Sequence, residues 1–430
     1  MTKKIYTSKI KPMKIASILV LAICIAACST SITDKDYRMV AEFEPTEYLI
    51  LSFRAGTHEM GSVSDDTLTV ALLNALTPHV KVLFIYKDTA QLSFMKSKLF
   101  EWGLDTVNIV FMYSEAKGGG AITDKAPLIL ANGKGELATI NFGWGCYGLL
   151  PPGDSCTIRD GDYDVMLAKD LNVRVLGKSN LVWEGGAKEN NSKGTLLLVE
   201  QLELQRNPGF TKEQIEQEHI SKLNLKKVIW LKKGVIEDDM LTVLPGGYYP
   251  VGCGGHVDEF CRFVNDSTIM LAITSIEESK TDSIALENYK RMEENHEILK
   301  NATDQDGKPF HIIRVPVAEI SSYEMKYEDI LPWYIDYYKG TKPGQTVKTI
   351  AASSYLNFII ANDVVVTAKY WKEGRSEASR IKDEKVYEIF TKAFPSKKII
   401  QIDMEGYNTE GGGMHCYSYN LPFGTSLNKK

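Results

Sequence analysis

A run of three glycines, Gly411 to Gly413, leads through Met414 and His415 directly to a cysteine, Cys416. Glycines allow the backbone to turn tightly and to approach a ligand closely. A thiol at the end of such a turn, beside polar neighbours, is positioned to act as a nucleophile. A buried cysteine on the last strand is the alternative, because free cysteine is among the most buried residue types.

Residues of types used in catalysis also occur at four other positions, beside turns that adjoin β-rich segments. They are Asp124, Glu184, His256 and Asp258. Each of them alone is explained as a turn residue, a surface charge or a metal ligand. Their recurrence at equivalent points of separate repeated units, together with the turn at Cys416, favours one shared site.

The chemistry that these side chains suit is attack on the carbon of a guanidinium group. Asp124 and Asp258 can bind the planar cation through paired, charge-assisted hydrogen bonds. The Cys416 thiolate would attack the carbon to form a thiouronium intermediate. His256 would protonate the departing ammonia and then activate water. Glu184 is expected to orient His256 and to favour its charged form.

Zinc binding is the competing interpretation for His256, Asp258, His415 and Cys416, all of which are possible ligands. The abundance of carboxylates around one cysteine fits a cationic substrate better. The sequence therefore predicts chemistry carried by side chains, with neither a cofactor nor a metal.

The elements that must position these residues form five units, in which paired β segments precede a helix and a further apolar strand. The units span residues 48–86, 127–176, 181–231, 259–315 and 355–402. In the third unit, 181–184 is expected to pair with 195–199, and a helix beginning after Thr211 has a capping box with Gln214. Five such units predict an α/β fold, a pseudo-symmetric ring whose central end gathers the unit starts.

The first residues are typical of an exported bacterial lipoprotein. Five lysines precede the apolar run from Ile15 to Ala27, which Cys28 follows directly. The run is too short to span a bilayer comfortably, and small residues before a cysteine resemble a lipobox. We expect a signal peptide at 1–27, lipidation of Cys28, a tether at 28–36 and one catalytic domain at 37–430. A plain cleaved signal peptide without lipidation is the alternative. If the protein is a lipoprotein, we expect it to contact the membrane of the cell envelope only through its lipid.

Composition excludes one class of partner and leaves the cysteine pairing open. The 50 basic and 55 acidic residues are mixed along the chain, with no basic stripe carrying interleaved aromatic residues, so nucleic acid is not an expected partner.

Beyond the export segment, five cysteines remain for an oxidising compartment, and one thiol is expected to stay free. Cys146 with Cys156, and Cys253 with Cys261, could each close a short loop, but sequence alone establishes neither bond.

Several motifs follow the order found in the agmatine deiminase and Porphyromonas-type peptidylarginine deiminase family of guanidine-modifying enzymes, which the chain resembles over nearly its whole mature length. These motifs lie at residues 39–45, 184–186, 206–208, 255–258, 301–304, 355–362 and 411–416. The resemblance implies the pentein fold, a five-bladed pseudo-symmetric α/β propeller of ββαβ-like units.

The resemblance also implies a role for each candidate residue. Cys416 corresponds to the nucleophile, His256 to the general acid and base, and Glu184 to the partner of that histidine. Asp124 and Asp258 correspond to the guanidinium clamp. Asn357 and Phe53 are further candidates for substrate contact. The pair Arg159-Asp160 lies after Trp144-Gly145 rather than before it, so Asp124 matches the family's order better.

The chain departs from the family at positions around the substrate. Arginine is usual at Thr123, asparagine at Gly413 and Glu259, aspartate at Gly254, and tryptophan at Ile50 and Phe53. The guanidinium machinery is retained, whereas the pocket for the other end of the substrate is changed.

Three functions remain open at this stage. Glu184 favours an agmatine-like small guanidine, and residues 143–148 lack the arginine pair expected to hold a C-terminal carboxylate. Export to the cell envelope favours peptidylarginine or free arginine instead. Thr123 and Gly413 leave room for a third function, a non-catalytic surface lipoprotein that binds guanidines.

Overall fold

The computed structural model describes residues 36–56, 64–116, 120–150, 154, 157, 160–240, 242–330 and 341–427. The chain from Asp34 to Lys430 forms one compact unit. The expected signal peptide, the lipidation site Cys28 and nearly all of the tether lie outside the described residues. So does Cys156, and with it the possible bond to Cys146. No helix in the described ranges is both long enough and apolar enough to cross a bilayer.

Five of the six sheets share one strand pattern, an antiparallel pair followed by a parallel neighbour. The first has the order β20 (Ser418–Pro422), β2 (Thr46–Leu51), β3 (Lys81–Tyr86), β4 (Ile109–Tyr113), and the second β1 (Tyr37–Met39), β5 (Leu130–Asn132), β6 (Leu137–Gly143), β7 (Arg174–Val182). The third contains β8 (Glu189–Asn190), β9 (Thr195–Val199) and β10 (Lys227–Leu231), the fourth β12 (Cys261–Asn265), β13 (Thr268–Ile273) and β14 (His311–Pro316), and the fifth β17 (Ile359–Ala361), β18 (Val364–Lys369) and β19 (Lys398–Asp403).

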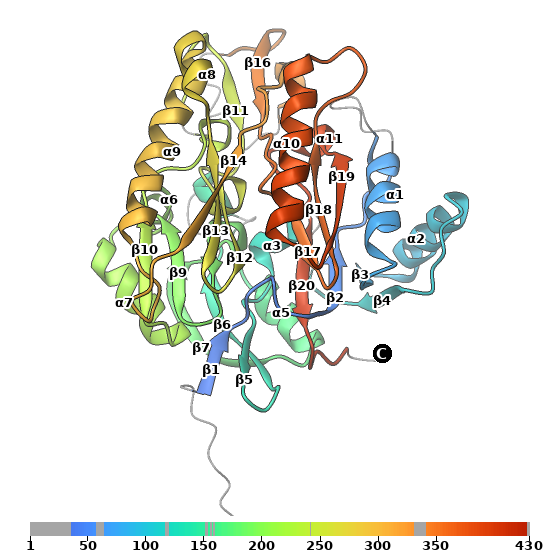
Figure 1. Ribbon diagram of the computed structural model, residues 1–430. Helices are drawn as coiled ribbons and strands as arrows, with labels where there is room; N and C mark the ends of the chain where they lie inside the picture. The colour runs from blue at the N-terminus through green and yellow to red at the C-terminus, as the bar shows by residue number, and fades with distance from the viewer. Residues whose placement is uncertain are drawn as a thin grey trace, which may run out of the picture. The chain divides into compact units, whose positions relative to one another are not determined.

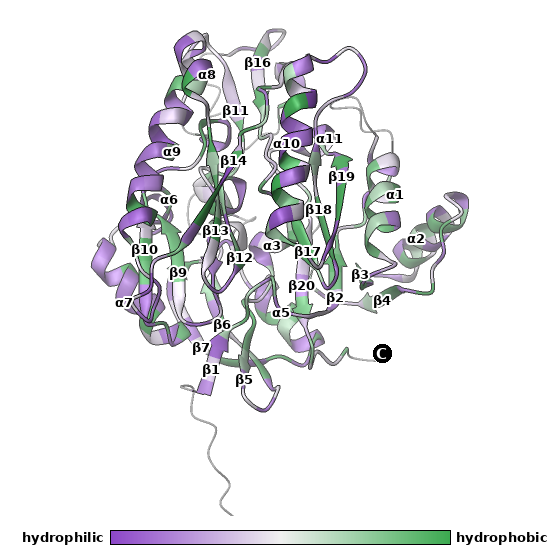
Figure 2. Cartoon of the chain, viewed as in Figure 1, coloured by the Kyte–Doolittle hydropathy of each residue, from purple (hydrophilic) through white to green (hydrophobic). Residues whose placement is uncertain are grey.

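Helices make the crossovers between the parallel strands, as such connections require. These crossover helices are α1 (Asp65–Leu76), α2 (Thr89–Glu101), α5 (Tyr163–Asp170), α6 (Glu200–Arg206), α7 (Lys212–Leu223), α8 (Ile276–Thr281), α9 (Ser283–Asn301) and α10 (Glu377–Ala393). Figure 2 shows largely hydrophobic strands such as β18 and β19 beside α10, whose surface is partly hydrophilic. On α10, Val386 and Phe390 are buried, so this helix covers its sheet with one apolar face.

Short helical elements occupy several of the connections between strands. They are α3 (Ile122–Lys125), η2 (Cys146–Gly148), η3 (Gly185–Ala187), η4 (Ile236–Asp238), η5 (Val257–Glu259), η6 (Tyr327–Asp329) and α11 (Glu405–Asn408). The sixth sheet, β11 (Tyr249–Val251), β16 (Thr346–Ala351) and β15 (Ser322–Lys326), was not predicted. Its strands come from long connections outside the five units.

The expected α/β class and most of the predicted elements are confirmed. The helix after Thr211 begins at Lys212, with both halves of the capping box to Gln214 formed. Two predictions of strand pairing need correction. Residues 181 and 182 end β7, and β8 pairs with β9 instead, because the two glycines after Glu184 form the turn η3.

The second correction concerns the first unit, whose antiparallel partner comes from the opposite end of the chain. Strand β20 pairs with β2, matching Leu51 to Ser418, and the two lie side by side in Figure 1. A periodic pattern within one segment cannot reveal a partner that is so distant in sequence. The possible bond between Cys253 and Cys261 is also absent, because both are free buried thiols.

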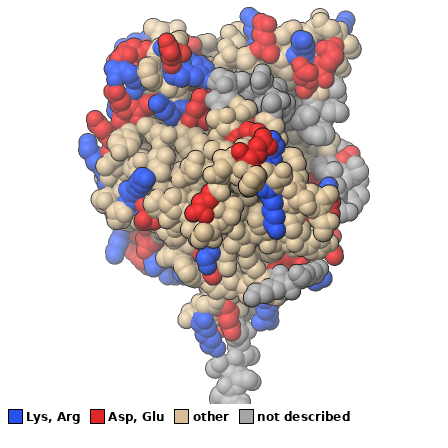
Figure 3. All heavy atoms as spheres, turned by 90° about the vertical axis from the view of Figure 1, so that its right-hand side faces the viewer, with Lys and Arg blue, Asp and Glu red and all other residues tan. Residues whose placement is uncertain are grey.

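The face of the molecule drawn in Figure 3 carries acidic and basic side chains close to one another. Deeper in the protein, a buried charge joins three of the segments that surround the site. The guanidinium of Arg262 on β12 forms ion pairs with Glu42 and Glu189. It also donates to the carbonyl oxygens of Leu356, at 3.3 Å, and Phe358, at 3.0 Å.

Replacing Arg262 by methionine should lower the free energy of unfolding by about 3 kcal/mol or more, because Glu189 would stay buried without its cation. Adding Glu189→Gln should recover part of this loss. The control Arg380→Met removes an exposed pair on α10 and should cost less than about 1 kcal/mol. Equal stability of Arg262→Met and Arg380→Met in denaturant titrations would contradict this account.

Candidate active site

Five buried side chains come together from the connections that precede β5, β8, β12, β17 and β20, one from each repeated sheet. They are Asp124, Glu184, Asp258, Asn357 and Cys416, each at most 2% exposed. The repeat therefore delivers its equivalent positions to one place. The structure brings together the residues predicted to share a site, Asp124, Glu184, His256, Asp258 and Cys416.

Asn357 connects the carboxylates of the site to the cysteine. Its amide nitrogen donates to Asp258 Oδ2 and Glu259 Oε1, both at 2.9 Å, and lies 3.4 Å from Cys416 Sγ. Its carbonyl oxygen accepts from the His415 backbone N–H at 3.0 Å. Asn357 thereby fixes the turn that carries Cys416 against the carboxylates, and the sulfur lies 4.0 Å from Asp258 Oδ2.

His256 is hydrogen-bonded to a buried carboxylate, which in turn is paired with a buried arginine. Its Nε2 is 2.8 Å from Glu184 Oε2, and Arg206 Nε donates to Glu184 Oε1 at 2.6 Å. Burial opposes charge on His256, but the carboxylates of Asp124 and Glu184 outweigh it and raise the pKa of the imidazole to about 9. Burial also opposes charge on Glu184, but Arg206 and His256 outweigh it and lower that pKa to about 2.

The backbone at His256 is held by a carboxylate that sequence analysis missed. Asp238 accepts hydrogen bonds from the backbone N–H groups of Cys253, Gly255 and His256, at 2.5, 2.8 and 2.6 Å. Burial raises the pKa of Asp238 to about 7, although the backbone donors and the His256 charge oppose this. No spacing in the sequence distinguishes this aspartate from the acidic residues beside it.

Asp124 faces the same place from helix α3. Its Oδ1 accepts from the Gly186 backbone N–H at 2.8 Å, and its Oδ2 accepts from the Tyr147 hydroxyl at 2.9 Å. Burial, in the presence of the carboxylates of Asp258 and Glu184, raises the pKa of Asp124, while the His256 charge opposes this. Tyr147 was also missed, because it lies in a short turn with no recognisable motif.

Gly186 allows the polar groups of the site to lie close to the backbone. A Cβ atom there would lie 2.7 Å from His256 Nδ1, 2.9 Å from Asp258 Oδ2 and 3.0 Å from Asp124 Oδ1. His256 Nδ1 and Asp258 Oδ1 are buried and have no hydrogen-bond partner. Buried polar atoms normally have partners, so these atoms mark the place of a polar ligand.

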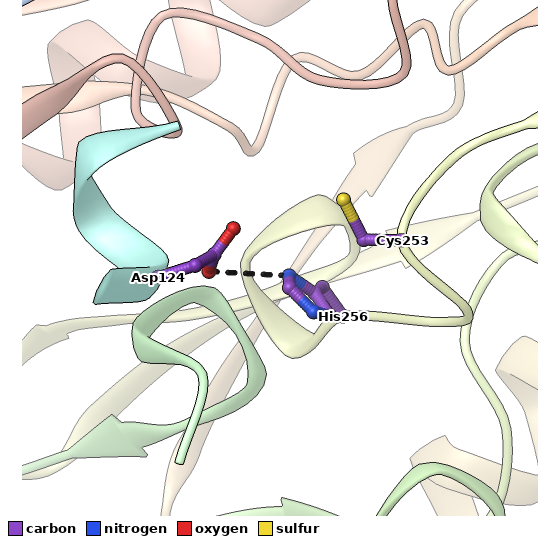
Figure 4. A group of neighbouring side chains, drawn as sticks. All are labelled: Asp124, Cys253 and His256. Carbon is purple, nitrogen blue, oxygen red and sulfur yellow. Dashed lines mark ion pairs between the residues drawn. The ribbon is translucent and has the colours of Figure 1, made fainter. Parts of the chain in front are cut away.

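The competing zinc set is not assembled. His415 bonds through Nδ1 to Asp258 Oδ2 and through Nε2 to Glu42 Oε1, both at 2.7 Å, so it is committed to two carboxylates. Within the described ranges, the group of possible ligands that does converge consists of Asp124, Cys253 and His256 (Figure 4). Cys416, the proposed nucleophile, is not a member of that group.

Two departures from the family have structural explanations. The Thr123 hydroxyl donates to the His415 carbonyl at 2.6 Å, and its backbone N–H donates to the Cys416 carbonyl at 3.2 Å. A Cβ at Gly413 would lie 2.4 Å from Asn357 Oδ1. Both residues therefore fit the turn that presents Cys416.

Phe53 and Asp160 make contacts with residues outside the five of this cluster. Phe53 packs on Phe84 and Trp102, with ring centroids 5.0 and 5.7 Å away, so its assignment to substrate contact stays a prediction. Asp160 pairs with Lys125 at 3.4 Å, whereas Arg159 lies outside the described residues.

The family model described as Porphyromonas-type peptidyl-arginine deiminase matches residues 38–422. The chain belongs to this family. Membership makes it a hydrolase of C–N bonds in guanidine groups, as the arrangement of Cys416, His256 and the carboxylates indicates.

Relatives and solved structures agree with this assignment. Agmatine deiminase from Medicago truncatula is 28% identical over 293 residues, 67% of this chain and 69% of the relative. The structure titled agmatine deiminase of Enterococcus faecalis has a TM-score of 0.67 at 23% identity, covering 91% of this chain and 97% of that one. Agmatine deiminase from C. jejuni has a TM-score of 0.65 at 21% identity, covering 91% and 97%. These structural matches show a shared fold.

The tight packing at Gly413 leads to a prediction about the residue that is usual in the family. Gly413→Asn should reduce kcat/KM at least tenfold, because the new Cβ displaces Asn357 and with it the turn of Cys416. The same substitution at Gly133, which has open space around it in the loop after β5, should leave activity unchanged. Full activity of Gly413→Asn in steady-state assays would show that the turn adapts freely.

Proposed function

We propose that this deiminase converts an agmatine-like small guanidine to its ureido product and ammonia, through a thiouronium intermediate on Cys416. The observation that carries the proposal is the group of buried carboxylates around His256, in which Asp258 Oδ1 and His256 Nδ1 have no hydrogen-bond partner. A guanidinium ion supplies both the positive charge and the N–H donors that these carboxylates need.

The thiol of Cys416 is protonated before substrate binds. Burial and the negative charges of Asp258, Glu259 and Asp124 raise its pKa well above the ordinary value. A guanidinium held by Asp124 and Asp258 offsets those charges and favours the thiolate, so the thiol loses its proton to solvent as the substrate binds. Substrate binding therefore prepares the nucleophile, and the Cys416 sulfur attacks the guanidinium carbon.

His256 then completes the two proton transfers. Its raised pKa means that it begins as an imidazolium, which donates a proton as the C–N bond to the leaving ammonia breaks. The neutral imidazole next takes a proton from water, whose oxygen attacks the thiouronium carbon. The C–S bond breaks, the hydroxyl proton of the intermediate passes to solvent, the ureido product leaves and the Cys416 thiolate is restored. Glu184 keeps the ring oriented throughout, because Arg206 holds it in place.

Charge also favours an amine-bearing guanidine over arginine. The buried cations nearest the site are already matched, Arg206 by Glu184 and Arg262 by Glu42 and Glu189. An α-carboxylate would approach a site rich in buried carboxylates whose two neighbouring arginines are already paired, whereas the second cation of agmatine would not be repelled. Peptidylarginine and free arginine form the runner-up class, supported by the family's name and the predicted export.

The fold proposal extends the repeat seen in the sheets. We propose that the five sheets with the shared pattern are the blades of a pseudo-symmetric propeller, with the site at its central end. Support comes from the five site residues that precede the first strands of these sheets, and from β20, which joins the end of the chain to its first repeat.

The substrate proposal is tested by measuring ureido product and ammonia from agmatine, arginine and arginyl peptides with the purified protein. Agmatine-like guanidines should give the highest kcat/KM. Cys416→Ala should abolish turnover yet still bind the best substrate in calorimetry, because the carboxylates supply the affinity. Faster turnover of arginyl peptides would move the assignment to the runner-up class, and binding without turnover by the wild type would indicate a non-catalytic binding protein.

The guanidinium clamp formed by Asp124 and Asp258 can be tested by replacing each carboxylate with an amide of nearly the same shape. Asp124→Asn and Asp258→Asn should each reduce kcat/KM about a hundredfold, on the order of 3 kcal/mol, because half of a buried charge pair is lost. Asp162→Asn, at the exposed start of α5, serves as a control and should cost little. A dispensable Asp124 would show that the clamp is assigned wrongly.

Residues 1–36 lead to a separate proposal, that the protein is exported and anchored in a bacterial envelope through a lipid on Cys28. It rests on the lysine-rich start, the apolar run and the cysteine that follows it. Labelled fatty acid should enter the wild-type chain, and Cys28→Ala should release soluble protein. Absence of label from the wild-type chain would refute lipidation.

A further inference from the structure

A second thiol lies in the active site, and the proposed reaction does not use it. Cys253 is buried, and its Sγ lies within 4.8 Å of ligand atoms of both Asp124 and His256 (Figure 4). The sulfur is 3.5 Å from the Gly411 carbonyl oxygen, at the start of the glycine turn that leads to Cys416. A thiol, an imidazole and a carboxylate gathered in this way are three of the ligand types that zinc prefers.

The imidazole already has the orientation of a metal ligand. Its Nε2 is bonded to Glu184, while its buried Nδ1 has no hydrogen-bond partner and lies 3.6 Å from Asp124 Oδ1. With metal–ligand bonds of about 2.0–2.3 Å, neighbouring ligand atoms in a zinc tetrahedron lie about 3.3–3.8 Å apart. A carboxylate on the far nitrogen is the usual outer partner of a zinc-bound histidine, because it fixes the ring and its tautomer.

The same atoms are needed for catalysis. Asp124 is half of the guanidinium clamp, and His256 is the general acid and base. An ion bound to both would occupy the place of the substrate cation and remove the proton donor. Coordination through Cys253 would release the proton of its thiol, because the thiolate is the form that binds metal.

We propose that Asp124, Cys253 and His256 form a binding site for Zn²⁺ or a similarly thiophilic divalent cation, which inhibits the enzyme in competition with its guanidinium substrate. Three protein ligands leave the fourth tetrahedral position for water. The proposed mechanism uses no metal, so a chelator should not lower the activity of the purified enzyme. Binding of the ion does not depend on the proposed deiminase activity, whereas the inhibition does.

Binding is tested with Zn²⁺ and Co²⁺ on the full chain. Wild type should bind one Zn²⁺ in equilibrium dialysis, and Co²⁺ should give a sulfur-to-metal charge-transfer band in the near ultraviolet. Cys253→Ala should lose that band and bind Zn²⁺ at least about tenfold more weakly. Cys261→Ala removes another buried thiol outside the group and should behave as wild type. Cys416→Ala should keep both the band and the affinity.

The second test measures inhibition of the enzyme by Zn²⁺. Zn²⁺ should raise the apparent KM of the wild type for its guanidine substrate with little change in kcat. Cys253→Ala and Cys253→Ser should keep the metal-free kcat/KM and require at least about tenfold more Zn²⁺ for the same inhibition. Undiminished Zn²⁺ affinity in Cys253→Ala, or loss of binding in Cys416→Ala, would overturn the proposal by placing the ion elsewhere. If both Cys253 variants misfold, the charge-transfer band is compared in Cys416→Ala and His256→Ala. A band that is kept in Cys416→Ala and lost in His256→Ala supports the site. A band that is lost in Cys416→Ala and kept in His256→Ala overturns it.

Discussion

Burial of several carboxylates around one point is the constraint on which the active site depends. An isolated charge inside a protein is costly unless it is paired and hydrogen-bonded. Glu184 meets this requirement through Arg206 and His256, and Asp124 does so in part through a backbone N–H and a tyrosine hydroxyl. Asp258 Oδ1 still has no hydrogen-bond partner. In the proposed reaction a cationic substrate supplies the missing charge and hydrogen-bond donors. Burial of these carboxylates opposes folding, but it would then supply affinity for the substrate and favour the Cys416 thiolate once the substrate binds.

Repetition of one sheet pattern explains how residues almost 300 positions apart meet. Each functional side chain lies in the short connection before the first strand of a repeat, where the adjoining strand fixes the backbone and the connection turns the side chain inward. Contacts between these connections set the geometry. Asn357 ties the turn of Cys416 to Asp258, and Thr123 ties the same turn to the segment of Asp124. The residues found in place of the family's usual ones at 123 and 413 are therefore parts of the support for the nucleophile.

Local sequence patterns correctly predicted structure that depends on neighbouring residues. They failed for strands whose pairing partner is distant in the sequence. The helix after Thr211 was predicted to the residue, because a capping box and a helical period are short-range features. The pairing of β20 with β2 was not predicted, and Glu184 was placed in a strand although glycines make a turn there. Motifs in the sequence named five residues that the structure brings together, Asp124, Glu184, His256, Asp258 and Cys416. Asp238, Tyr147 and Cys253 were not assigned to the site, because each acts through a tertiary contact that leaves no periodic or motif signal.

The central claim is that Cys416 forms a covalent intermediate with a guanidinium carbon held between carboxylates. Its most direct test is rapid acid quenching during turnover of the best guanidine substrate, followed by peptide mass spectrometry. The account predicts a substrate-dependent adduct on the peptide that contains Cys416, which disappears when the substrate is exhausted. Turnover without any adduct on Cys416, or with the adduct on Cys253 instead, would contradict it.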